Sequence, residues 1–323
     1  MKKTRSLFLM LLCCLLLLCG CAGPSQVKPY EAGENELLRD PHYTYGFDVS
    51  AFNANESQGV PVGQLKFGGE ALEGAPVWRL AQWGCTKNLM DAALEKEDFV
   101  YTYDDGGKRV VVDTNTGAIS LGINADVEYE GEVRQDGEEW PHLLVEQTVA
   151  PSGRLADLEH LYMELEFTLT EFENLMDAAD MQTYHSAQFQ WFVTLQNKNS
   201  ESPNFNRSMW FGLGFFDRRY DYPPMFAAQD GGKEDNTGMF IYIVDSKKYL
   251  DAPVTVGNKV YVKYDILPQV KTGLIIAQQR NFLTETEFED LELGSTNIGW
   301  EMTGNFNANV DISKMRITKV PKG

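Results

Sequence analysis

The stretch HSAQFQWFVTLQ at residues 185–196 decides the fold class. Its odd-numbered positions from Ala187 to Leu195 are all apolar, whereas its even-numbered positions carry Ser, Gln or Thr, with Phe192 as the exception. Alternation with a period of two residues is the pattern of a β-strand that buries one face and leaves the other open. We therefore expect a strand with an apolar face in a core and an opposite face that presents amides.

The same alternation recurs along the chain. Residues 161–170 and 209–215 repeat it most clearly, and other β-rich runs are found at residues 100–103, 109–113, 118–123, 141–149, 239–244, 259–266, 273–278 and 315–320. Asp- and Gly-rich turn sequences separate the first three of these other runs. Only residues 88–98 have the spacing of a helix of any length, and residues 175–181 add at most a turn. Many strands with few helices predict an all-β fold, an antiparallel β-sandwich.

The N-terminus has the features of an export signal. Lys2, Lys3 and Arg5 precede an unbroken apolar run from Leu7 to Leu18. This run is shorter than the roughly 20 apolar residues that a membrane-spanning helix needs. We therefore interpret residues 1–20 as a signal peptide that is removed during export.

The residues that follow resemble a known processing motif. Leu18-Cys19-Gly20-Cys21 is similar to the bacterial lipobox, and that resemblance implies that Cys21 carries a lipid and anchors the protein to the outer side of the cell membrane. The alternative is an ordinary secretory signal with incidental cysteines. Residues 21–42 are rich in Gly, Pro, Glu and Asn and are predicted to be a flexible tether, which leaves residues 43–323 as one β-sandwich domain. Lone Cys85 is expected to be a small buried hydrophobe rather than a nucleophile.

Charge limits the kinds of partner. The formal net charge is −19, so the surface repels nucleic acid and anionic lipid. This charge serves solubility at a cell surface, and it also favours neutral or cationic ligands. The sequence contains no nucleophile elbow, phosphate loop, dinucleotide fingerprint, HExxH or paired CxxC, so it predicts no cofactor and no clustered metal site.

The polar face of the 185–196 segment is the candidate ligand site. Its amides are Gln188, Gln190 and Gln196, followed by Asn197, and Trp210 adds an aromatic ring on the 209–215 segment. Sugars pair their hydroxyls with amides and stack their C–H faces on aromatic rings. Gly212 and Gly214 are expected to leave space beside Trp210. The pattern therefore predicts a carbohydrate ligand, and a solvated outer face with incidental glutamines is the alternative.

Two neighbouring segments add charged side chains to the predicted ligand site. Asp217, Arg218 and Arg219 end the 209–215 segment, and a guanidinium such as that of Arg218 suits a sugar carboxylate. An internal Asp–Arg pair is the competing interpretation. The acidic, glycine-rich residues 230–238 can wrap a structural calcium ion, but they lack the spacing of an EF-hand, which favours a plain surface loop.

Catalytic residues are harder to identify from the sequence. His142 and Glu146 alternate onto one side of a predicted strand and so form a possible acid/base pair, and Glu164 and Glu166 are a possible carboxylate pair for glycoside hydrolysis. The alternatives are a histidine that caps the strand start and solvated glutamates, which arise easily among 47 acidic residues.

One family resemblance extends over residues 43–320. The segments 188–197, 210–217 and 240–242, with Gly299-Trp300 and the final strand, are similar to the jelly-roll sandwiches of concanavalin A-like lectins and glucanases. The glucanase pattern ExDxxE does not occur, so no catalytic residue is carried over. Three hypotheses follow: a surface lipoprotein that binds a glycan, a glycoside hydrolase or polysaccharide lyase on the same fold, and a structural or interaction lipoprotein without a saccharide ligand.

Overall fold

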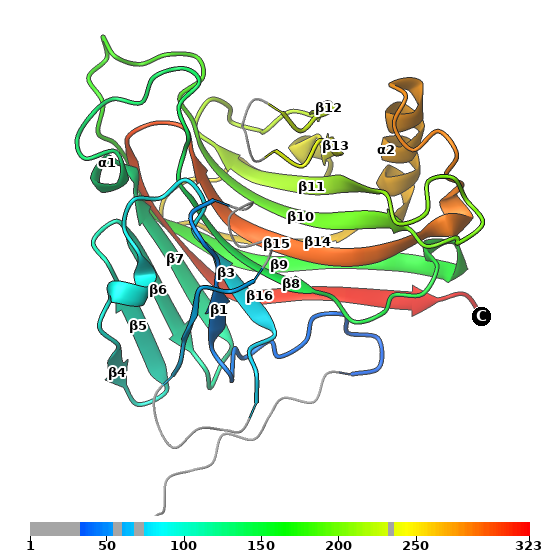
Figure 1. Ribbon diagram of the computed structural model, residues 1–323, viewed down its shortest axis with the longest axis horizontal. Helices are drawn as coiled ribbons and strands as arrows, with labels where there is room; N and C mark the ends of the chain where they lie inside the picture. The colour runs from blue at the N-terminus through cyan, green and yellow to red at the C-terminus, as the bar shows by residue number, and fades with distance from the viewer. Residues whose placement is uncertain (1–32, 54–59, 68–73, 232–235) are drawn as a thin grey trace, which may run out of the picture.

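The computed structural model describes residues 33–53, 60–67, 74–231 and 236–323, and it is a β-sandwich of two sheets (Figure 1). The nine-stranded sheet has the order β12-β13-β11-β10-β15-β8-β3-β1-β2, and the seven-stranded sheet has the order β14-β9-β16-β7-β6-β5-β4. The predicted all-β sandwich of jelly-roll type is confirmed. Two of the pairings, β1 with β3 and β11 with β13, are parallel and depart from the antiparallel prediction.

The element bounds are as follows. The nine-stranded sheet contains β1 (Phe47–Val49), β2 (Gly63–Leu65), β3 (Trp78–Ala81), β8 (His142–Thr148), β10 (Ala187–Asn197), β11 (Ser208–Asp217), β12 (Phe226–Gln229), β13 (Phe240–Val244) and β15 (Leu291–Met302). The seven-stranded sheet contains β4 (Glu95–Glu97), β5 (Val100–Asp104), β6 (Lys108–Asp113), β7 (Ala118–Asn124), β9 (Leu158–Asn174), β14 (Lys259–Asp265) and β16 (Phe306–Pro321). The helices are α1 (Ala125–Glu128) and α2 (Leu267–Gln279), with short 3-10 turns at Leu89–Asp91, Leu155–Asp157, Ser246–Lys248 and Phe288–Asp290.

The core lies between the two sheets and follows the alternation read from the sequence. The odd-numbered positions of β10 are buried, and Trp191 is fully enclosed. Phe189 meets Phe167 of β9 across the sandwich, with ring centroids 5.2 Å apart, and packs against Trp300 of β15 at 5.4 Å. The even-numbered face of β10 therefore points away from the seven-stranded sheet.

Two local predictions were wrong. Residues 273–278 were predicted to be a strand, but they belong to α2, in which Val270, Leu274 and Ala277 form a buried stripe at helical spacing. Residues 88–98 were predicted to be a helix, but the turn Leu89–Asp91, capped by the Asn88 side chain, ends at once. The chain then forms β4, an edge strand paired with β5.

The N-terminal boundary of the packed domain also differs from the prediction. Residues 33–42 were expected to end a flexible tether, yet Leu37 and Leu38 are part of the core. Glu36 is 6% exposed and accepts hydrogen bonds from the Arg316 side chain and the Ile317 backbone of β16. The predicted signal peptide, Cys21 and residues 22–32 of the tether lie outside the described residues. Within the described part, no helix has the length and apolar character that a membrane crossing requires.

Candidate functional site

Two adjoining cavities lie over the outer face of the nine-stranded sheet, and together they are called the cleft. The first has a volume of about 190 Å³ and is lined by Trp83, Trp140, His142, Leu144, Phe192, Trp210, Asp230, Asn236, Thr237, Ile241, Asn297 and Glu301. The second has a volume of about 390 Å³ and is lined by Gln188, Gln190, Phe192, Gly214, Phe216, Asp217, Arg219, Tyr220, Pro223, Pro224, Met225, Phe226, Ile241, Ile243 and Glu301. Phe192, Ile241 and Glu301 line both cavities, so Glu301 lies where they meet.

The register of four neighbouring strands places four polar side chains in one row across the cleft. Gln188 of β10 pairs with Asp217 of β11 on one side and with Glu301 of β15 on the other. Glu301 in turn pairs with His142 of β8. Residues that are directly opposite on neighbouring strands share a face, so four strands place a carboxylate, an amide, a second carboxylate and an imidazole side by side.

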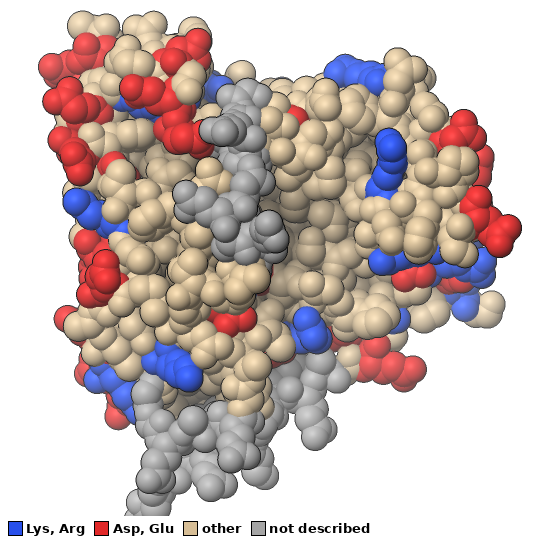
Figure 2. Space-filling view, in the orientation of Figure 1, with Lys and Arg blue, Asp and Glu red and all other residues tan. Residues whose placement is uncertain are grey.

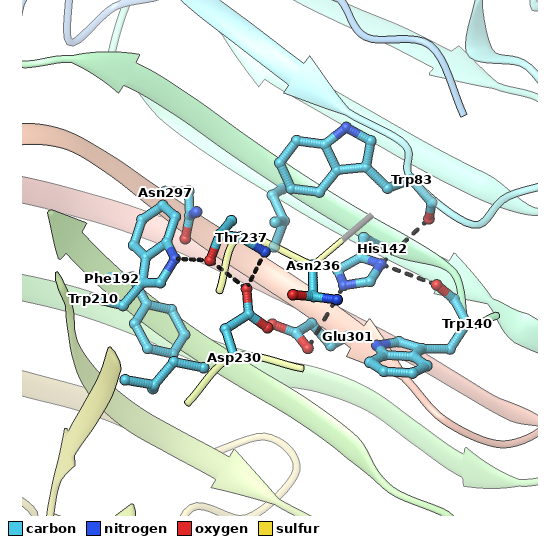
Figure 3. Close-up of a pocket in the computed structure, with 12 residues that line it drawn as sticks. Trp83, Trp140, His142, Phe192, Trp210, Asp230, Asn236, Thr237, Asn297 and Glu301 are labelled. Atoms are coloured by element: carbon cyan, nitrogen blue, oxygen red, sulfur yellow. Dashed lines mark hydrogen bonds and ion pairs between the residues drawn. The ribbon is translucent and has the colours of Figure 1, made fainter. Parts of the chain in front are cut away.

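His142 and Glu301 form the central contact of this row (Figure 3). His142 Nδ1 lies 2.9 Å from the carbonyl oxygen of Trp140 and 3.3 Å from that of Trp83. Carbonyl oxygens only accept hydrogen bonds, so Nδ1 carries the hydrogen. The other nitrogen, Nε2, is 3.6 Å from Oε2 of Glu301 and becomes the cation of an ion pair when it is protonated. The imidazole and the carboxylate therefore lie within ion-pair distance of each other at the meeting point of the two cavities.

Aromatic rings form much of the first cavity. Trp140 stacks on His142 with a centroid separation of 6.0 Å, and Trp83 meets the same imidazole edge-on at 5.9 Å. Trp210 packs edge-on against Phe192 at 6.1 Å. Figure 3 shows these rings around a common space, with polar side chains between them.

The second cavity contains a buried carboxylate that is bonded to side chains of the protein. Asp217 is 4% exposed and is held by Arg219, whose Nη2 lies 2.6 Å from Oδ2. Gln188 Nε2 donates to the same oxygen at 3.1 Å. Tyr220 and Phe226, each 48% exposed, add apolar surface at its rim.

The predicted amides divide into two groups. Gln188 and Gln190 line the second cavity, and Trp210 lines the first. Gln196 lies outside both and donates to the carbonyl of Asn206. Asn197 is fully buried, because its odd-numbered position faces inward, and it donates to Ser202 and Thr286.

The positions of Arg218 and Gly212 differ from what the sequence predicted. Arg218 does not line the cleft; it donates to the His185 carbonyl and lies over the ring of Phe306. Arg219, its neighbour in the sequence, lines the cleft and makes the internal Asp–Arg pair. The space expected over Gly212 is filled, since a Cβ there would lie 2.4 Å from the Phe192 ring.

The predicted acid/base pair does not form. His142 lines the first cavity, but Glu146 is four residues further along β8, about 13 Å away at the rise of a strand. Glu146 instead forms an ion pair with Arg79 of β3. Burial raises the pKa of Glu146, and the Arg79 guanidinium opposes that shift.

Glu164 and Glu166 lie on β9 in the other sheet and line neither cavity. Glu164 bonds to Lys314 and Tyr261, and Glu166 bonds to Lys259 and Ser313. Burial opposes ionisation of Glu164, but the hydrogen bonds from Lys314 and Tyr261 outweigh it and hold its pKa below the ordinary value. Both glutamates thus belong to ion pairs of the outer surface.

The calcium prediction falls partly outside the described residues, because 232–235 are not described. Asp230 and Thr237 at the two ends of that loop bond to each other. In the described ranges, no group of three or more His, Cys, Asp or Glu is arranged to hold a metal ion.

The sequence-based predictions did not include Glu301, Trp83 or Trp140 as site residues, and they placed Asp230 only in a calcium-binding or plain surface loop. A signal for Glu301 existed, because the apolar residues Ile298, Trp300 and Met302 alternate with Asn297, Gly299 and Glu301, at the same period of two residues as in the 185–196 segment. That alternation marks Glu301 as an outer-face residue. Nothing local marks Trp83, since the fold alone brings its loop to the cavity.

Acidic side chains gather around α1, and a second group lies at the opposite end of the face shown (Figure 2). Lys and Arg are more scattered on the face shown. Among the described residues that line the cleft, Arg219 is the one Lys or Arg side chain.

No protein-family model and no curated protein matches the chain. Among solved structures, it is similar to a family 12 xyloglucanase from Bacillus licheniformis, with 11% identity, a TM-score of 0.41, and coverage of 72% of this chain and 99% of that one. It is also similar to endoglucanase Cel12A from Rhodothermus marinus, with 10% identity, a TM-score of 0.37, and coverage of 75% and 99%. A third similarity is to the xyloglucanase domain of NopAA from Sinorhizobium fredii, with 11% identity, a TM-score of 0.35, and coverage of 71% and 97%. The assignment of a β-sandwich rests on the two sheets themselves.

Proposed function

We propose that the protein binds a glycan chain in the cleft. The observation that carries this proposal is the combination, in one recess, of indole rings with a row of amide and carboxylate side chains. A sugar ring offers a C–H face to an indole and hydroxyls to amides and carboxylates. The two cavities meet at Glu301, so a chain of several sugar units can contact both.

Calorimetric titration of the purified protein with a panel of neutral and charged oligosaccharides tests this proposal. Replacing Trp210 with Ala removes one ring of the first cavity, and we expect at least one oligosaccharide to bind the wild type about tenfold more tightly than this variant, a loss of about 1.4 kcal/mol. Tyr261→Ala is the matched control, because Tyr261 is 53% exposed and lies on β14 of the other sheet. If no oligosaccharide bound, or if both variants bound alike, the cleft would not be a glycan site.

Hydrolysis of the bound glycan is the second candidate function, and the His142–Glu301 contact favours it. A carboxyl group that lies beside an imidazole in a cleft is a candidate general acid for protonating a leaving oxygen. Asp217 lies in the same row, two strand spacings or about 10 Å away between backbones. Inverting glycosidases separate their two carboxyl groups by about 6.5 to 9.5 Å, and side chains from such a pair of strands can span that range.

Detection of new reducing ends separates a binding protein from an enzyme. For an enzyme, Glu301→Gln should lower the rate by about 10² to 10⁴, as expected for loss of general acid catalysis, at oligosaccharide concentrations that saturate the variant. Glu166→Gln, on the other sheet, is the control and should keep full activity. Absence of reducing ends with the wild type, on a glycan that binds, would leave binding as the function.

We also propose that the protein is held at the outer side of the cell membrane by a lipid on Cys21. The charged and apolar segments before Leu18-Cys19-Gly20-Cys21 support this localisation. Metabolic labelling with a palmitate analogue should mark the wild type and not Cys21→Ser. A labelled Cys21→Ser protein would place the lipid elsewhere, and an unlabelled wild type would remove the lipid anchor.

A further inference from the structure

We propose that the first cavity recognises a protonated amino group, so that the preferred glycan contains amino sugars with free amines. This inference rests on the proposed function and adds a substrate class to it. The ammonium group of such a sugar would lie near Asp230, with its ring against the indoles. Neutral and N-acetylated sugars lack the charge that this arrangement favours.

The first observation is the pairing of aromatic rings with carboxylates. Trp83, Trp140 and Trp210 line the first cavity with Asp230 and Glu301, and among the described residues that line it there is no Lys or Arg. The face of an indole ring attracts cations, by about 0.5–1 kcal/mol at exposed sites and by about 2 kcal/mol or more where water is excluded. A cavity that combines indoles with carboxylates therefore favours a cation over a neutral group.

The second observation concerns the bonding of Asp230. Its Oδ2 accepts hydrogen bonds from the backbone N–H of Thr237 at 2.8 Å and from the Thr237 hydroxyl. Both donors are neutral, so they fix the carboxylate without cancelling its charge. Trp210 Nε1 donates to the same hydroxyl at 3.3 Å, which ties the carboxylate to the edge of an indole (Figure 3).

Other carboxylates on this sheet face have a different environment. Asp217 bonds to the guanidinium of Arg219, and Glu146 bonds to that of Arg79. The negative charge of each is therefore balanced by an arginine of the protein. Asp230 differs because, within the described ranges, its hydrogen bonds come from the backbone N–H and the hydroxyl of Thr237.

Trp140 already shows that a cation is accepted beside this cavity. The Arg134 guanidinium lies over its ring at 5.2 Å from the centroid, and Arg134 is 4% exposed and does not line the cavity. This contact occupies Trp140 from the protein side. The amine is therefore expected on the side of Asp230 and Trp210.

Titration calorimetry with three β-1,4-linked oligosaccharides of equal length tests the inference. The probes are oligomers of glucosamine, of glucose and of N-acetylglucosamine, compared at pH 5.5 and low ionic strength. We expect the glucosamine oligomer to bind at least tenfold more tightly than the glucose oligomer. Asp230→Asn should remove that preference, because it lowers the affinity for the glucosamine oligomer about tenfold more than the affinity for the glucose oligomer.

The control addresses the overall negative charge, which attracts any polycation. Asp311→Asn makes the same charge change on β16 of the other sheet, at an exposed position, and should keep the preference. Equal binding of the glucose and glucosamine oligomers, or equal losses in Asp230→Asn and Asp311→Asn, would overturn the amine inference while glycan binding stands. Binding of none of the three would count against the glycan site itself.

Discussion

Oε2 of Glu301 lies 3.6 Å from Nε2 of His142, although the two residues come from strands that are far apart in the sequence. The antiparallel pairing of β15 with β8 puts them directly opposite each other. Because the other nitrogen of His142 is bonded to the carbonyls of Trp83 and Trp140, one imidazole links the carboxylate to two ring-bearing segments of the cavity. His142 thus links the carboxylate of Glu301 to the loops that carry Trp83 and Trp140 in the wall of the first cavity.

His142→Asn is expected to weaken oligosaccharide binding about tenfold. The change removes the partner of Glu301 and releases two carbonyls, which should also lower the free energy of unfolding by about 1–3 kcal/mol. Calorimetry and urea denaturation measure the two effects. His160→Asn is the matched control, since His160 also faces a carboxylate, Asp265 Oδ2 at 2.8 Å, but lies on the outer face of the other sheet. Equal affinity losses in both variants would contradict a specific role for His142.

Lys108→Met is expected to destabilise the protein by about 3–5 kcal/mol, because it leaves the Glu128 carboxylate buried without its counter-ion. Neither side chain of this pair is exposed to solvent. Glu128 also accepts from the backbone N–H groups of Thr86 and Lys87, so the pair fixes the loop that follows Trp83. Thermal or chemical denaturation measures the loss, and Lys108→Met combined with Glu128→Gln should recover part of it. No recovery would show that the charge left on Glu128 is not the cause.

The thiol of Cys85 should be inert in the folded protein. Burial raises its pKa to about 12, so the thiolate is essentially absent at pH 8. A thiol reagent should label Cys85 within minutes in guanidinium chloride and only at the rate of unfolding in buffer. Mass spectrometry of the two samples measures the difference. Rapid labelling of the native protein would indicate that the loop carrying Cys85 opens.

Acid should selectively remove the stabilisation that Glu164 provides. Its pKa is lower in the folded protein than the ordinary value of 4.5, so its contribution is fully present above that pH and is lost as the pH falls through the folded-state value. The difference in unfolding free energy between wild type and Glu164→Gln should therefore shrink below about pH 4.5. Denaturation curves at pH 7 and pH 3.5 test this. A constant difference would contradict the lowered pKa, and ligand affinity at pH 7 should be unchanged.

Alternation along single segments was enough to predict most of the sandwich. The outward direction of Gln188 and Gln190 follows from Ala187, Phe189 and Trp191, which are buried. Alternation is misleading where a short apolar run fits both a strand and a helix. Residues 273–278 contain two adjacent isoleucines and resemble a strand, but in the folded protein they complete the buried stripe of α2.

The site was less predictable because its parts come from separate strands and loops. Asn197 continues the row of amides in the sequence, yet its odd-numbered position turns it inward. Arg218 and Arg219 are equivalent in the sequence, and only the geometry after β11 decides which of them faces Asp217. Glu301 becomes a candidate only when β15 is placed beside β8.

Quenching of tryptophan fluorescence by acrylamide tests the central claim most directly. Trp83, Trp140 and Trp210 line the first cavity and are partly exposed, whereas Trp78, Trp191 and Trp300 are buried in the core. A saturating oligosaccharide, chosen by calorimetry, should therefore protect the first three from the quencher and lower the Stern–Volmer constant clearly. An unchanged constant at saturation would show that the sugar binds elsewhere.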